Sequence, residues 1–245
     1  MKISIITITY NSEATLVNTL NSVLSQSYKN IEHIIIDGMS KDKTLEICSN
    51  FPHISKIISE PDSGVYNAFN KGLRLANGDI IGFLNSDDIF YNEYSVEEIV
   101  NVFLENEVDI VYGNLDYINE NGKIIRNWIS KPFKKGFSKK AWMPAHPTFY
   151  CKKNIYNLYG GYDESFKIGG DFELSLRFLE VHNASSYFLN KKLVKMLIGG
   201  ISNKGLISKW IIYKEELRAL RKNKILVNPI SFLFYKLIKI KQFIS

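Results

Sequence analysis

The sequence predicts an α/β domain built on a mostly parallel, Rossmann-like central sheet flanked by helices. Apolar, β-branched runs alternate with amphipathic stretches through residues 1–90, as expected for parallel βαβ units. Polar residues follow the ends of these runs, and residues 91–125 change to a helix and a hairpin pattern. A chain of 245 residues, 45% of them hydrophobic, is long enough to bury one full core.

Charge and cysteine content narrow the class of protein. A net charge of +6 and a pI near 9.0 favour an anionic partner, such as a nucleotide, a phospholipid surface or nucleic acid. Cys48 and Cys151 lack metal-type spacing, which argues against a disulfide framework or structural zinc and fits a reducing cytosol. Residues 1–12 have the pattern of a strand and not of a signal peptide, so we expect no export.

The first two strands each end in polar residues. Residues 3–8 lead into Thr9-Tyr10-Asn11-Ser12, whose serine is expected to cap a helix with an apolar stripe over residues 16–24. Residues 34–36 form the second strand, which ends at Asp37-Gly38. Both strand ends are expected at the same edge of the sheet, where ligands bind in open α/β folds.

A third strand at 54–58 precedes a helix expected over residues 65–76. Asp62 lies just before this helix, where its carboxylate either caps the helix or holds a ribose or sugar hydroxyl. Lys71 lies off the apolar face of the helix, so its ammonium group either meets a phosphate or faces water. A lone helical lysine usually faces water.

The most informative strand covers residues 80–84 and leads to Asp87 and Asp88. Its apolar run follows the helix-stopping pair Asn77-Gly78, as expected for an interior parallel strand. Two carboxylates at this strand end are candidates for metal or substrate contact. The alternative is a solvated Asp-Asp turn, because Asp is common in loops.

The second half begins with an amphipathic helix over residues 95–104, in which Ser95 and Glu98 form a capping-box pattern. The dipeptide Asn121-Gly122 then favours a two-residue hairpin turn. The flanking strands are expected at residues 108–112, 115–118 and 123–125. This half is expected to build the other side of a cleft without forming a separate domain.

Two further polar residues are candidates for the cleft. His146 lies between two prolines, where it either contacts a diphosphate or acceptor or is a structural histidine held by the prolines. Asp171 follows Gly169-Gly170 at the start of a helix. Its carboxylate either caps that helix or points into the cleft.

The C-terminal tail combines apolar and basic residues. Residues 225–245 interleave Ile, Leu and Phe with lysines and follow the basic stretch 218–224. The tail is too short and too charged to span a membrane. It is either an interfacial membrane anchor or a helix packed on the domain with its lysines in water.

Five segments follow one another along residues 2–200, namely ITITYNSEATL, IIIDGMSKDKT, SEPDSGVYNAFNKGL, GFLNSDD and GGYDESFKIGGDFELSLRF. In this order they resemble family 2 glycosyltransferases of the GT-A fold, especially the branch that makes bacterial surface polysaccharides such as O-antigen, capsule and exopolysaccharide. The resemblance implies one transferase domain over residues 1–205, with a nucleotide-binding half (1–90) and an acceptor-side half with a smaller sheet (91–205), followed by a basic helical extension over 206–245.

The resemblance also implies roles for individual residues. Asp87 and Asp88 match the acidic metal motif, which would hold Mn²⁺ or Mg²⁺, and Asp171 matches the catalytic base. Thr9, Tyr10, Asn11 and Asp37 would bind the base and ribose of the nucleotide. The full expected donor site is Thr9, Tyr10, Asn11, Asp37, Asp62, Lys71, Asn85, Ser86 and Asp87.

At one position the residue type differs from that in many relatives, which have an acidic residue two positions before the metal-binding Asp. This chain has Asn85 there. Its amide can accept a hydrogen bond from ribose but supplies no charge, so metal binding is assigned to Asp87 with Asp88 as helper. The relatives' C-terminal Gly-Gly-X-Ser pattern appears as Gly199-Gly200-Ile201-Ser202 and is expected to form a loop over the donor.

The implied reaction is inverting transfer of a hexose from a nucleotide-sugar, with UDP expected, to a hydroxyl of a lipid-diphosphate-linked saccharide. A divalent cation would offset the charge of the leaving diphosphate, and a carboxylate across the cleft would take the proton of the acceptor hydroxyl. Such an enzyme is expected in the cytoplasm or on the inner face of the membrane.

Rival interpretations are weaker. A non-catalytic sugar-nucleotide-binding homologue would keep the fold without turnover, and Asn85 keeps that alternative open. A nucleic-acid-binding protein is disfavoured because the basic residues are scattered and no known module appears. A dinucleotide oxidoreductase is disfavoured because no G-x-G-x-x-G follows the first strand.

Overall fold

The computed structural model describes residues 1–199 and 205–241, and its strands form one sheet in the order β3-β2-β1-β4-β8-β6-β9-β5, with β7 paired to β6. The strands are β1 (Ile3–Thr9), β2 (Ile31–Asp37), β3 (Ile54–Ser59), β4 (Ile80–Phe83), β5 (Asp88–Phe90), β6 (Ile110–Ile118), β7 (Ile124–Trp128), β8 (Tyr150–Lys152) and β9 (Ser186–Leu197). The helices are α1 (Leu16–Leu24), α2 (Thr44–Ser49), α3 (Val65–Leu75), α4 (Ser95–Glu105), α5 (Lys153–Tyr159), α6 (Gly170–Leu176), α7 (Gly205–Lys222) and α8 (Pro229–Lys241), with short turns η1 (Ser138–Lys140), η2 (His146–Thr148) and η3 (Arg177–Val181).

The first half of the sheet is parallel, as expected. β1 lies between β2 and β4, and the register pairs Thr9 with Asp37 and Ile6 with Phe83. The three strands are rich in Ile and almost fully buried, which is typical of parallel strands covered on both faces. Their carboxyl ends therefore meet at one edge, where the polar residues begin.

The second half continues the same sheet in mixed orientation. β8 pairs antiparallel with both β4 and β6, and so joins the two halves. The hairpin around Asn121-Gly122 is confirmed, but β6 is one strand where two were expected. The turn is also longer than two residues, because the Asn119 N–H donates to the Lys123 carbonyl (3.0 Å) across the loop.

Two predicted helix caps are wrong. The Ser12 hydroxyl lies 2.8 Å from that of Ser86, and α1 begins only at Leu16. Ser95 is the first residue inside α4, and its side chain bonds to Asn92. In both cases a nearby loop side chain competes for the hydroxyl that would have capped the helix.

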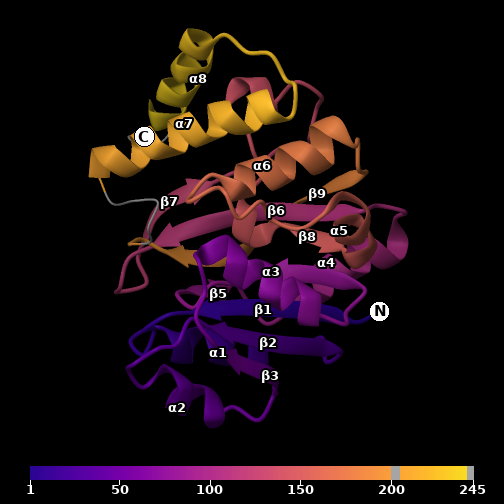
Figure 1. Ribbon diagram of the computed structural model, residues 1–245. Coiled ribbons are helices and arrows are strands. Elements are labelled where there is room, and N and C mark those ends of the chain that lie inside the picture. The colour runs from indigo at the N-terminus through magenta and orange to yellow at the C-terminus, as the bar shows by residue number, and fades with distance from the viewer. Residues whose placement is uncertain (200–204, 242–245) are drawn as a thin grey trace.

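The C-terminal tail packs on the domain, one of its two predicted alternatives. α7 lies against α6, and α8 folds back beside α7 at the end of the molecule far from β3 (Figure 1). Ala219, Leu220 and Phe232 are fully buried in the core shared with α3 and α6. The same helices expose Ile207, Trp210, Ile230 and Phe234. None of the helices in the described part of the chain has the length and apolar character needed to cross a membrane.

Candidate active site

The ends of β1 and β2 are tied together by Asp37. This fully buried carboxylate accepts hydrogen bonds from Thr9 Oγ1 (2.9 Å), Ser59 Oγ (2.6 Å), and the backbone N–H (2.9 Å) and hydroxyl of Ser40. Burial alone would raise the pKa of Asp37, but the bonds from Ser40, Ser59 and Thr9 lower it below its ordinary value. Asp37 therefore organises the loop after β2 as an ionised acceptor.

Tyr10 and Asp62 flank the next residue, Gly38, and Asn11 bonds to the loop that follows it. A Cβ atom at Gly38 would lie 2.6 Å from Asp62 Oδ2 and 3.4 Å from the Tyr10 ring, so the glycine allows these groups to approach. The Asn11 side chain accepts a hydrogen bond from the Lys41 N–H (2.9 Å). Tyr10 keeps 64% of its surface exposed. The structure thus gathers these predicted donor residues at one strand edge.

Lys71 and Asp62 frame the loop before α3. Lys71 is buried, donates to the Pro61 carbonyl (2.5 Å) and pairs with Glu60 Oε1 at 3.0 Å. The alternative in which Lys71 faces water is therefore wrong, because Pro61 and Glu60 of the loop supply its acceptors. Asp62 accepts a hydrogen bond from the Gly64 N–H (3.0 Å), just before α3 begins at Val65.

Asp88 is more deeply buried than Asp87, the acid before it. Asp88 is fully buried, and its Oδ2 accepts a hydrogen bond from Asn85 Nδ2 (3.1 Å). Its Oδ1 is buried without a hydrogen-bond partner in the described part of the chain. Burial, with Asp87 adding to it, raises the pKa of Asp88 well above its ordinary value. Such an oxygen is unfavourable unless a proton or a cation satisfies it.

A divalent cation at this strand end would have few ligands from the protein. Within residues 1–199 and 205–241, no three His, Cys, Asp or Glu side chains gather closely enough to hold a metal by themselves. The alternative of a solvated Asp-Asp turn is wrong for Asp88, because this residue is buried. A cation at this strand end would therefore need further oxygen ligands from a bound molecule, as Mg²⁺ commonly does.

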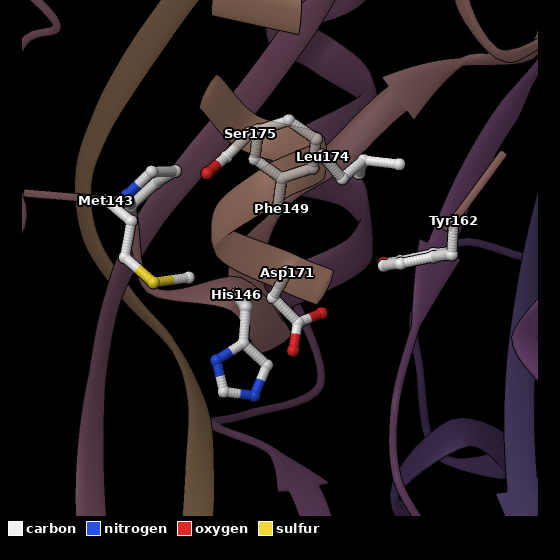
Figure 2. A pocket seen from close by; sticks show the side chains of 8 residues that line it. Met143, His146, Phe149, Tyr162, Asp171, Leu174 and Ser175 are labelled. Atoms are coloured by element: carbon white, nitrogen blue, oxygen red, sulfur yellow. The ribbon is translucent and has the colours of Figure 1, made fainter. Parts of the chain in front are cut away.

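Asp171 does not cap its helix. The residue before α6 is Gly169, and no side chain caps it. Asp171 instead lies in the first turn of α6 and lines a small pocket with His146 (Figure 2). The rest of the lining is Met143, Pro144, Phe149, Tyr162, Leu174 and Ser175. Burial raises the pKa of Asp171, and His146 and Tyr66 partly offset the rise.

The imidazole of His146 affects the pKa of two of the predicted site acids, Asp87 and Asp171. Burial raises the pKa of Asp87, and His146 partly offsets that rise, as it does for Asp171. Both carboxylates are therefore affected by the same imidazole, which lines the pocket beside Asp171. In Figure 2 the Asp171 carboxylate and the His146 ring lie side by side. The edge of Trp128 also contacts His146, with ring centroids 6.1 Å apart.

Tyr66 is a site residue that the sequence pattern did not reveal. Its hydroxyl donates to the Ile168 carbonyl (2.6 Å), accepts from the Gly170 N–H (2.8 Å) and lies 3.4 Å from Asp171 Oδ2. Tyr66 is buried although it lies off the apolar stripe predicted for α3. A large aromatic residue outside the stripe was the one available signal for a second contact surface.

Comparison with known families identifies the chain. Residues 4–166 match the model of glycosyl transferase family 2. The protein belongs to this family. The predicted family and the predicted activity class, a glycosyltransferase, are thus confirmed.

The curated relatives of this glycosyltransferase include proteins from several bacteria. An uncharacterized glycosyltransferase of Mycobacterium tuberculosis is 34% identical over 71% of this chain and 68% of its own length. One of Rickettsia typhi is 28% identical over 79% of this chain, but the match spans only 63% of that relative. A PGL/p-HBAD biosynthesis glycosyltransferase of Mycobacterium bovis is 26% identical over 89% of this chain and 83% of its own length.

Solved structures confirm the GT-A fold of the transferase. A Staphylococcus aureus TarS fragment in complex with UDP-GlcNAc superposes with a TM-score of 0.73 at 20% identity, over 93% of this chain and 68% of that one. The mannosyltransferase PcManGT of Pyrobaculum calidifontis, in complex with GDP-Man and Mn²⁺, gives 0.69 at 15% identity, over 96% and 68% of the two chains. The second half of the expected glycine-rich loop, Gly200-Ile201-Ser202, lies outside the described residues.

Proposed function

We propose that the protein transfers a hexose, with inversion, from a UDP-sugar to a hydroxyl of a lipid-diphosphate-linked saccharide in bacterial surface polysaccharide synthesis. The observation that carries the proposal is the pocket lined by Asp171 and His146, whose imidazole also partly offsets the burial-raised pKa of Asp87 beyond the end of β4. One acid beyond a strand end and a second acid in a pocket suit a displacement in which the first helps to hold the donor and the second activates the acceptor.

The donor nucleotide is assigned to the loops after β1 and β2. Tyr10 offers an exposed ring beside Gly38, and Asp62 offers a carboxylate that can accept ribose hydroxyls. Thr9, Asn11 and Asp37 hold the loop in shape, and Lys71 fixes the Glu60-Pro61 segment beside it. The TarS and PcManGT complexes, which hold UDP-GlcNAc and GDP-Man, support a nucleotide-sugar as donor.

The divalent cation, Mn²⁺ or Mg²⁺, is assigned to Asp87 and Asp88. Their donor set fits, because carboxylate oxygens suit hard cations and Asp88 Oδ1 has no hydrogen-bond partner among the described residues. When bound, the cation would neutralise the charge of the departing diphosphate. Asn85 donates its amide to Asp88, and Ser86 contacts Ser12, so both shape this strand end.

Asp171 is assigned as the base. Its carboxylate would take the proton of the acceptor hydroxyl as that oxygen attacks the anomeric carbon. A pKa raised by burial makes Asp171 a stronger base than a solvated carboxylate. His146 lines the pocket beside Asp171, where it can donate a hydrogen bond to a diphosphate oxygen or an acceptor oxygen.

The acceptor proposal points to a membrane surface. Residues 205–245 hold nine Lys or Arg against two Glu, so the net charge of this segment is larger than the net charge of +6 of the whole chain. Exposed apolar side chains on α7 and α8 accompany that charge. A basic and apolar face suits the anionic inner leaflet, where a lipid-linked acceptor would be found.

The reaction is tested by substituting the two assigned carboxylates. A panel of UDP- and GDP-sugars with Mn²⁺ first identifies the donor through diphosphate release. Asp171→Asn is expected to lower turnover by about 10²-fold or more with donor affinity retained, whereas Asp87→Ala is expected to weaken Mn²⁺-dependent donor binding. Asp79→Asn, before the opposite end of β4, is the control. Normal turnover of Asp171→Asn would refute the base assignment.

A further inference from the structure

We propose that Glu215 on α7 is a positioning residue that fixes the turn carrying Asp171. The inference rests on the base role proposed for Asp171. Glu215 lies outside residues 4–166, the part of the chain that matches the family model. This role of Glu215 would make α7 contribute to the active site, in addition to packing on the domain.

The Glu215 carboxylate binds three successive backbone N–H groups. Oε1 accepts from Lys167 (2.9 Å), and Oε2 accepts from Ile168 (2.9 Å) and Gly169 (2.8 Å). Consecutive N–H groups that converge on one anion form a nest, and hydrogen bonds to a charged acceptor are stronger than neutral ones. The next two residues along the chain are Gly170 and Asp171.

Two more residues of α7 hold the chain just upstream. Arg218 donates to the Ser165 carbonyl (2.9 Å), and its guanidinium lies 3.8 Å from the centre of the Phe166 ring. Lys222 pairs with Asp163. Positions 215, 218 and 222 lie on one helix face. One face of α7 therefore contacts residues 163–169 in succession, up to the start of α6.

The opposite side of this turn is held by α3. Tyr66 bonds to the Ile168 carbonyl and the Gly170 N–H. A Cβ atom at Gly169 would lie 2.8 Å from Glu215 Cβ, and one at Gly170 would lie 2.6 Å from the Tyr66 ring. Glycine is therefore required at both positions, because Gly169 lies close to α7 and Gly170 lies close to α3. The turn lies between α3 of the nucleotide half and α7 of the C-terminal extension.

The position of Asp171 depends on this backbone. Its carboxylate has a long contact of 3.4 Å with the Tyr66 hydroxyl, which by itself fixes the side chain weakly. Displacement of a reacting group by about 1 Å can lower a rate by about 10²-fold. Loosening the turn should therefore lower turnover while leaving donor binding, which uses other loops, almost unchanged.

The test compares Glu215→Gln with Glu216→Gln. Gln offers one acceptor oxygen, and its amide NH₂ would face three N–H donors, so the nest is disrupted. Glu216 is the matched control, because it is the adjacent residue of α7 and pairs with Lys236 of α8. Hydrogen exchange at residues 167–169 is expected to be about tenfold faster, or more, in Glu215→Gln only. Turnover is expected to fall about 10- to 100-fold with donor KM within about threefold.

Other outcomes overturn the inference. Unchanged exchange at 167–169, unchanged turnover in Glu215→Gln, or equal losses in Glu215→Gln and Glu216→Gln would each do so. If Glu215→Gln does not fold, Arg218→Gln, an exposed position, should show smaller changes in the same direction, and their absence would also overturn it. Normal turnover of Asp171→Asn would instead refute the base assignment, and the exchange rates alone would then decide whether Glu215 holds the turn.

Discussion

At the scale of single residues, two buried acids of this protein, Asp37 and Asp88, have different roles because their hydrogen-bond partners differ. Asp37 is buried but fully hydrogen-bonded, so the folded protein favours its ionised form. Asp88 is equally buried but has one oxygen without a hydrogen-bond partner in the described part of the chain. The folded protein therefore disfavours its charge. The first residue stabilises a loop, whereas the second is suited to receive a cation.

The role of Asp37 predicts a pH-dependent loss of stability. Asp37→Asn removes a charged acceptor of four hydrogen bonds and is expected to lower the free energy of unfolding by about 1–3 kcal/mol at pH 7. The pKa of Asp37 is lower in the folded state than its ordinary value. Its stabilisation is thus present above the unfolded pKa of about 4 and is lost as the pH falls through the folded value.

Urea unfolding of both proteins from pH 7 down to about pH 3 measures this difference. The two curves should converge at the acidic end. A stability difference that stays constant with pH would mean that Asp37 acts through packing and not through its charge.

At the scale of helices and strands, the sequence predicted the elements better than their ends and partners. The apolar runs of β1, β2 and β4 are fixed by local pattern and were found where expected. Ser12 and Ser95 failed as caps because Ser86 and Asn92 compete for their hydroxyls. These competitors are set by loop conformation and tertiary contact, which no local pattern specifies.

The candidate site shows the same limit. Asp87 and Asp171 could be identified from their segments, but the pocket around Asp171 also includes His146, which comes from the separate turn η2. Tyr66 and Glu215 escaped prediction because both act on the backbone of one turn. Backbone contacts of this kind leave no residue pattern in the segment that receives them.

The packing of α8 predicts unequal effects for two phenylalanines. Phe232 is fully buried, whereas Phe234 is 61% exposed two residues later. Phe232→Ala is expected to lower the free energy of unfolding by about 3–5 kcal/mol, and Phe234→Ala by less than about 0.5 kcal/mol. Urea unfolding measures both. Equal effects would mean that α8 is not docked on the domain as described.

At the scale of the whole molecule, the positive charge is concentrated at one end. The chain outside residues 205–245 is close to neutral, because those residues account for more than the whole net charge. α7 and α8 lie at the end opposite β3 (Figure 1). An amphipathic pattern does not distinguish a protein partner from a lipid partner. In the structure, some apolar side chains of α7 and α8, including Phe232, are buried in the core, whereas others are exposed.

The exposed part predicts binding to anionic membranes. The protein is expected to sediment with vesicles that contain phosphatidylglycerol, less so at high salt, and weakly with neutral vesicles. Replacing both Trp210 and Phe234 by Ala should lower vesicle affinity by about tenfold or more, because two exposed aromatic side chains would no longer enter the lipid.

The choice of variant matters, because removing α8 would also remove Phe232 from the core and unfold what it is meant to test. Leu158→Ala, an equally exposed apolar position on α5, is the control and should leave vesicle binding unchanged. If the double variant binds as tightly as the wild-type protein, the exposed face of α7 and α8 does not meet lipid. A lipid-linked acceptor would then have to reach the crevice without help from this surface.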